Sequence, residues 1–111
     1  MQLYMLTPWK EGDKGPFYCP DCGVVEGFLA YNPKAREKME IIQVEFPRPR
    51  PALVQLLGEE NQSSPVLVLD PGSVLPEGGK KSLTTGRIFI DDPQAIIGFL
   101  VQTMDGAIRP H

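Results

Sequence analysis

Apolar positions along the chain follow two patterns, one typical of β-strands and the other typical of α-helices. Short runs of apolar or alternating residues predict strands at 2–7, 41–46, 65–69 and 87–90. Apolar residues at helical spacing predict a helix over about 20–32, a short helix at 52–57 and a last helix from residue 93. The expected order is therefore β-α-β-α-β-β-α, with loops at 8–16 and 70–86.

This order of elements predicts how the strands pair. The first β-α-β unit should cross over right-handed, which makes strands 2–7 and 41–46 parallel. Only a loop separates strands 65–69 and 87–90, so we expect them to pair antiparallel. The result is an α/β fold with a mixed four-stranded sheet and helices on both faces. A length of 111 residues favours one domain over 1–111.

Proline and aspartate mark the starts of two helices. Pro20 suits a first helical position because its missing N–H would have no partner there. We therefore expect the first helix to begin at Cys19 or Pro20. Asp92 is expected to cap the last helix, with Pro93 as that helix's first residue.

Composition and charge narrow the class of protein. Hydrophobic residues make up 41% of the chain, which is ordinary for a protein with an apolar core. A net charge of −3 argues against a nucleic-acid binder, which would carry a basic field. No apolar run approaches the ~18 residues that a membrane span requires. The first ten residues do not resemble a secretory signal, so we expect a cytoplasmic protein.

The two cysteines, Cys19 and Cys22, are the strongest chemical signal. Their spacing at a helix start favours a reactive pair, because unpaired N–H groups there lower the pKa of a thiol from about 8.5. The plain alternative is two small buried apolar residues. A structural zinc site needs four ligands, and His111 is the one histidine. A zinc or iron–sulfur site would therefore need two chains to share four thiolates.

The predicted order and three local motifs resemble the thioredoxin superfamily in its short, glutaredoxin-like form. Cys19-Pro20-Asp21-Cys22 stands where these proteins keep their redox motif, and Ser64-Pro65 stands where they have a cis-proline. The run Asp92-Pro93-Gln94-Ala95-Ile96 with Phe99-Leu100 is similar to one in the N-terminal domains of glutathione transferases. As a whole, the chain looks most like an uncharacterised bacterial family of thioredoxin-like proteins.

The resemblance implies a thiol–disulfide oxidoreductase in which Cys19 attacks and Cys22 resolves. Its partner would be a protein disulfide or a small-molecule thiol, with glutathione as a candidate ligand. If Pro65 is cis, the Ser64 backbone would lie beside Cys19 and pair with a substrate chain. Pro93 stands where transferases have a serine that holds the γ-glutamyl group, and proline cannot donate a hydrogen bond.

Other residues complete the expected substrate site, which we place at Tyr18, Pro20, Ser64, Pro65, Arg48, Arg50 and Asp92. Tyr18 would flank the motif as an aromatic wall. The two arginines could bind a carboxylate such as that of glutathione, or be solvated. Trp9 either covers the cleft or pins its loop to the core. Two further functions stay open: a non-catalytic binding module, and a metal or cluster carrier formed by a dimer.

Overall fold

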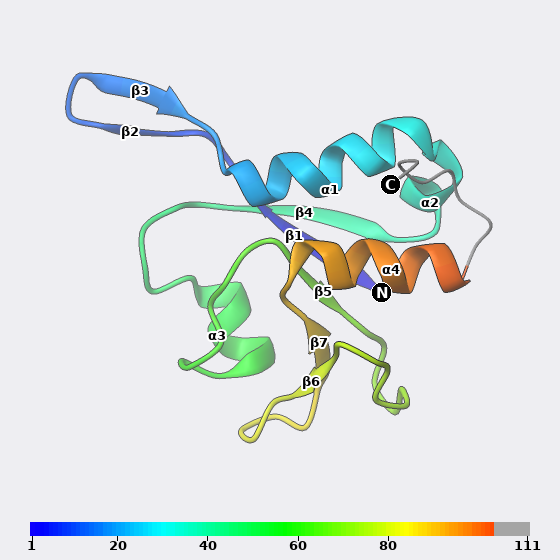
Figure 1. The fold of residues 1–111 in the computed structure, drawn as a ribbon. Coiled ribbons are helices and arrows are strands. Elements are labelled where there is room, and N and C mark those ends of the chain that lie inside the picture. Colours follow the sequence, from blue (N-terminus) through cyan, green and yellow to red (C-terminus); the bar gives the residue numbers. More distant parts are fainter. Residues whose placement is uncertain (104–111) are drawn as a thin grey trace.

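The computed structural model describes residues 1–103, which fold into helices and strands around one main sheet (Figure 1). In chain order the elements are β1 (Gln2–Leu6), β2 (Trp9–Glu11), β3 (Lys14–Phe17), α1 (Pro20–Tyr31), α2 (Pro33–Glu37), β4 (Glu40–Val44), α3 (Pro51–Leu57), β5 (Val66–Val68), β6 (Lys80–Lys81), β7 (Ile88–Ile90) and α4 (Pro93–Thr103). Every predicted strand and helix is present. The last residues of the chain, including His111, lie outside the described residues.

The main sheet has the strand order β4-β1-β5-β7-β6. β1 is parallel to β4 and antiparallel to β5, and β7 pairs antiparallel with both β5 and β6. The predicted parallel and antiparallel pairings are confirmed. The predicted strand number was wrong, because Lys80 and Lys81 add β6 at an edge of the sheet. Two exposed lysines have no apolar alternation that could mark a strand.

Helices cover both faces of the sheet, as predicted, because successive side chains on a strand point to opposite sides. Leu3 and Met5 of β1 pack in one cluster of buried residues with the apolar sides of α1 and α4. Tyr4 lies between them in sequence but packs in a second cluster with Leu53 and Leu57 of α3. Figure 1 shows the same division, with α1 and α4 on one side of the sheet and α3 on the other.

A β-hairpin formed by β2 and β3 projects from the body between β1 and α1 (Figure 1). The sequence predicted a loop here, and that expectation was wrong. Glu11 pairs with Lys14 across a two-residue turn in which Gly12 has φ of 64°. Glycine at the first position of such a turn is typical of tight hairpins. Most residues of these short strands are exposed and their apolar residues do not alternate, so they gave no strand pattern.

Two predictions at the ends of helices are confirmed. α1 runs from Pro20 to Tyr31, and Asn32 ends it. A second helix, α2, which was not predicted, begins directly at Pro33. At the start of α4, the Asp92 carboxylate accepts a hydrogen bond from the Ala95 amide at 2.9 Å, so Asp92 is the predicted cap.

Candidate functional site

Cys19 forms the N-cap of α1, directly after the hairpin. Its backbone is extended, with φ of −73° and ψ of 113°, and its carbonyl oxygen accepts from the Gly23 amide at 3.0 Å. Pro20 occupies the start of the helix, where no N–H partner is needed, and Asp21 lies in the first turn. The sequence therefore places a sulfur atom, rather than the usual hydroxyl or carboxylate, at the capping position.

The Cys19 sulfur lies in the region where the helix backbone favours negative charge. Its Sγ atom accepts a hydrogen bond from the Cys22 amide at 3.2 Å. Amides in the first turn of a helix have no partner within the helix, and the helix dipole adds a partial positive charge there. Both Cys19 and Cys22 carry free thiols. This geometry therefore suits a sulfur that reacts in its thiolate form.

Cys22 lies one turn further along α1 and is only 6% exposed. The Leu6 amide of β1 donates to its Sγ atom at 3.5 Å, and the Ser64 hydroxyl oxygen lies 3.7 Å from it. Burial raises the pKa of Cys22 to about 11, and the side chain of Cys19 also raises it. The contacts with Leu6 and Ser64 lower the pKa of Cys22 but do not offset burial. Cys22 is therefore held as a neutral thiol.

Ser64 lies beside both cysteines. The bond between Ser64 and Pro65 is cis, the arrangement on which the expected contact with Cys19 depended. The Cys19 thiol and the Ser64 carbonyl oxygen are 3.8 Å apart, with Cys19 as donor. The Ser64 hydroxyl donates its proton to the Tyr4 carbonyl at 2.9 Å.

Arg50 is buried, with 6% of its side chain exposed, and its guanidinium donates to backbone carbonyls. Nε and Nη2 reach the Phe46 carbonyl at 3.1 and 2.7 Å, and Nη1 reaches the Gln62 carbonyl at 2.7 Å. Burial lowers the pKa of Arg50, as does Arg48, whereas Cys19 and Cys22 raise it. The Arg50 guanidinium therefore joins the segment before α3 to the one that carries Ser64.

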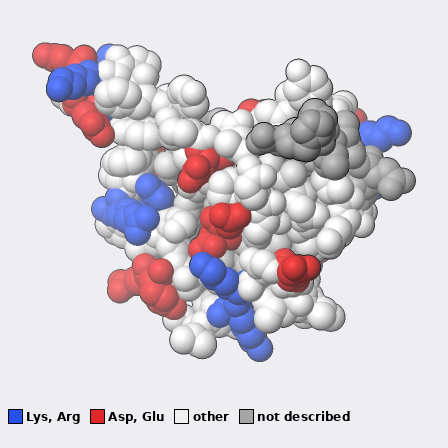
Figure 2. All heavy atoms as spheres, viewed as in Figure 1, with Lys and Arg blue, Asp and Glu red and all other residues white. Residues whose placement is uncertain are grey.

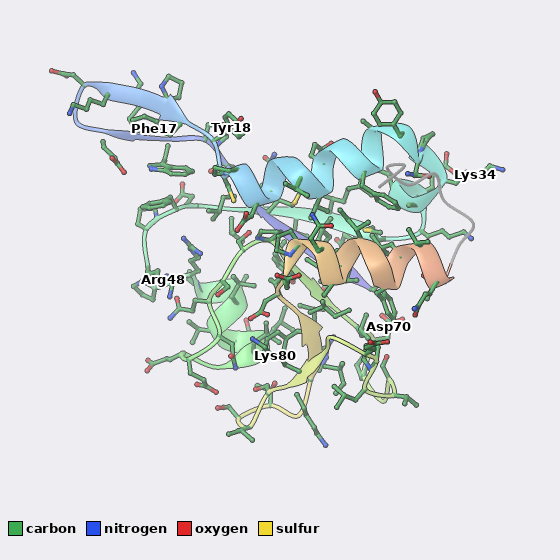
Figure 3. The ribbon with its side chains drawn as sticks, in the orientation of Figure 1. Phe17, Tyr18, Lys34, Arg48, Asp70 and Lys80 are labelled. Atoms are coloured by element: carbon green, nitrogen blue, oxygen red, sulfur yellow. The ribbon has the colours of Figure 1, made fainter. Side chains whose placement is uncertain are left out.

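Arg48, the other predicted carboxylate ligand, is exposed to solvent (Figure 3). It lies in the same proline-rich segment as Arg50, between β4 and α3. The two arginines thus differ in their surroundings, although the sequence gave them the same expected role. Of the two, Arg48 is the one whose side chain faces water.

A group of aromatic residues lies on the hairpin and on the segment after β4, and sequence reasoning identified only part of this group. Trp9 stacks on Phe46 with ring centroids 4.2 Å apart and 13° between the planes, and Phe17 lies 6.2 Å from Trp9. We call these three side chains the aromatic stack. Tyr18 is 71% exposed, and a Cβ atom built on Gly23 would lie 3.3 Å from its ring. Trp9 thus joins the hairpin to Phe46, and it also packs against the core cluster that contains Cys19.

The described residues 1–103 contain no group of three or more His, Cys, Asp or Glu side chains placed to hold a metal ion. His111 lies outside that range. Over the same residues, no helix has the length and apolar character needed to cross a membrane.

The fold and this site define an α/β protein with a mixed five-stranded sheet, whose paired cysteines lie at the start of its first helix. The chain belongs to the family described as "Protein of unknown function (DUF3088)", whose model matches residues 1–107. Neither a curated protein nor a solved structure matches it significantly.

Proposed function

We propose that the protein is a thioredoxin-like thiol–disulfide oxidoreductase in which Cys19 is the nucleophile and Cys22 the resolving thiol. The observation that carries this proposal is the 3.2 Å hydrogen bond from the Cys22 amide to the Cys19 sulfur at the start of α1. The strand order β4-β1-β5-β7, with β1 parallel to β4, supports the thioredoxin-like assignment. The contact between the Ser64 carbonyl and Cys19 supports it as well.

The two cysteines have different environments that suit successive steps. In the first step the Cys19 thiolate attacks one sulfur of a substrate disulfide, and the second substrate sulfur leaves as a thiolate that takes up a proton. In the second step Cys22 loses its proton and attacks Cys19, which releases the first substrate sulfur. The substrate gains two electrons, and the protein is left with a Cys19–Cys22 disulfide. A thiol or dithiol reductant then restores the pair.

The high pKa of Cys22 explains why Cys19 reacts first and Cys22 second. A thiol with a pKa of about 11 is almost wholly protonated near neutral pH, so it does not compete for the substrate. Once a mixed disulfide forms on Cys19, its sulfur no longer carries negative charge. Attack by Cys22 is then intramolecular, and its proximity offsets the small thiolate fraction.

A trapping experiment tests the proposal. The Cys22→Ser variant should accumulate a mixed disulfide on Cys19 when it is mixed with a disulfide-containing peptide, because the resolving thiol is missing. The adduct is detected as a mass increase that disappears on reduction. The native protein should instead form an internal disulfide, with a loss of two mass units.

The matched control is the Cys19→Ser variant, which keeps one cysteine but should form no adduct at the same peptide concentration. Equal adduct formation by the two variants would contradict the assigned roles. Absence of any adduct from the Cys22→Ser variant would favour a non-catalytic binding module. Zinc or iron bound to a dimer and lost in both variants would favour a shared metal site.

A further inference from the structure

We propose that the aromatic stack is a recognition surface for an extended polypeptide with an apolar side chain next to its disulfide. This inference rests on the proposed function and names the substrate class of the same site. The stack consists of Trp9, Phe17 and Phe46 as defined above. It would hold the residue that flanks the substrate cysteine while the substrate sulfur meets Cys19.

The position of the stack supports this role. Phe17, Tyr18 and Cys19 are consecutive, so the end of the hairpin leads directly into the capping sulfur. Figure 3 shows Phe17 and Tyr18 where the hairpin meets α1. The Trp9–Phe46 contact joins the hairpin to the segment after β4. A substrate that reaches Cys19 from this side therefore passes aromatic rings from two separate parts of the chain.

The stack also leaves apolar surface open to solvent. Phe17 is 38% exposed and Phe46 is 37% exposed, and Tyr18, next to Phe17 in the chain, is 71% exposed. Aromatic side chains are enriched at recognition surfaces because they offer a large apolar contact area with little loss of conformational freedom. The rings are held by one another, so little ordering remains for a partner to impose.

The balanced charge of the hairpin suits binding of an uncharged peptide segment. The hairpin carries two cations, Lys10 and Lys14, and two anions, Glu11 and Asp13, so its own charge is balanced. Figure 2 shows these charges gathered at the outer end of the hairpin, with an uncharged surface between that end and the body. The hairpin itself therefore offers no net electrostatic attraction to an anionic tripeptide such as glutathione.

Two of the groups expected to hold glutathione already have other partners, whereas Arg48 is exposed. The Arg50 guanidinium donates to the Phe46 and Gln62 carbonyls. The Asp92 carboxylate caps α4 through the Ala95 amide. Pro93, at the start of that helix, has no donor. An apolar polypeptide requires none of these groups, because contact with the rings supplies its affinity.

The test uses two matched ten-residue peptides, each with one cysteine activated as a disulfide with 2-thiopyridine. One peptide has leucine and phenylalanine beside the cysteine, and its twin has serine at both positions. The native protein should release thiopyridine from the apolar peptide about tenfold faster, since burial of even part of one large apolar side chain supplies that difference. Glutathione disulfide serves as a small reference substrate for each variant.

Single substitutions test whether the preference for the apolar peptide depends on the aromatic stack. Phe46→Ser and Phe17→Ser should each reduce the preference for the apolar peptide to within about twofold, and the rate with glutathione disulfide should fall by less than the rate with the apolar peptide. Tyr31→Ser is the matched control, since Tyr31 is an exposed aromatic residue at the far end of α1. That variant should keep the full preference.

The outcomes separate this inference from the proposed function. Equal rates for the twin peptides in the native protein, or a preference that survives in both stack variants, would overturn the recognition surface alone. Rates in the native protein no faster than in Cys19→Ser, with all three disulfides, would overturn the proposed function and this inference together.

Discussion

At the scale of single residues, Ser64 contacts the two cysteines through two different atoms. Its carbonyl oxygen faces the Cys19 sulfur at 3.8 Å, and its hydroxyl oxygen faces the Cys22 sulfur at 3.7 Å. The Tyr4 carbonyl fixes the direction of the hydroxyl proton. One residue from the segment before β5 therefore sets the surroundings of both thiols.

The raised pKa of Cys22 predicts how slowly it reacts with an alkylating reagent. A rise from 9.0 to about 11 leaves a thiolate fraction about one hundred times smaller than in the unfolded chain at pH 8. In the Cys19→Ser variant, where Cys22 is the one thiol, the contribution of Cys19 is lost but burial, the largest cause of the raised pKa, remains. Iodoacetamide should therefore react at least about tenfold faster in denaturant than in buffer. Mass spectrometry against time measures both rates, and equal rates would contradict the burial argument.

At the scale of elements, the contacts of Arg50 predict that replacing it destabilises the protein much more than replacing Arg48. Arg50→Met should lower the free energy of unfolding by about 2–4 kcal/mol, because it leaves the Phe46 and Gln62 carbonyls without their donor. Arg48→Met is the matched control and should change it by less than about 0.5 kcal/mol, since Arg48 is exposed. Urea denaturation followed by circular dichroism measures both values. Similar losses in the two variants would show that Arg50 does not join its two segments.

The sequence predicted well those elements whose signals are local. Apolar runs marked the strands that became β1, β4, β5 and β7, and the prolines marked the starts of α1 and α4. The β2–β3 hairpin and β6 were missed, because their residues are exposed and their pairing depends on partners and turns instead of apolar periodicity. Gly12 was the one local signal for the hairpin, and it was interpreted only as a loop residue.

The candidate site shows the same limit. Cys19 and Cys22 were identified from their spacing, and the closeness of Ser64 to Cys19 was expected from the resemblance. The sequence could not distinguish the role of Arg50 from that of Arg48. It also could not show whether Trp9 covers a cleft or holds its loop to the core. Their contacts join segments that are far apart in sequence, such as Trp9 with Phe46.

At the scale of the whole molecule, both faces of the sheet carry a group that resists ionisation. Cys22 lies in the cluster beneath α1 and α4, and Tyr4 lies in the cluster beneath α3. Burial raises the pKa of each, and Glu40 further raises that of Tyr4. Each group is therefore most stable uncharged, and the protein as a whole should be sensitive to alkali.

The direction of this sensitivity follows from proton linkage. A folded-state pKa above the unfolded value contributes stability that is complete below the unfolded pKa and disappears as pH rises through the folded pKa. For Cys22 the window runs from about pH 9 to about 11, and the loss is at most about 3 kcal/mol. Chemical denaturation between pH 8 and 11 should show a steeper decline in the native protein than in Cys22→Ala. The decline that remains in the variant reports Tyr4, and identical slopes would contradict the assignment to Cys22.

The position of β1 as an interior strand of the sheet has a consequence for synthesis on the ribosome. β1 pairs with β4 on one side and with β5 on the other, yet it is made before either of them. Its buried residues Leu3, Tyr4 and Met5 have no strand to pair with until the chain has extended past residue 44, and both neighbouring strands exist only after residue 68. During that interval the segment is an unpaired apolar strand, which makes it the part of the nascent chain that a chaperone would be expected to bind first.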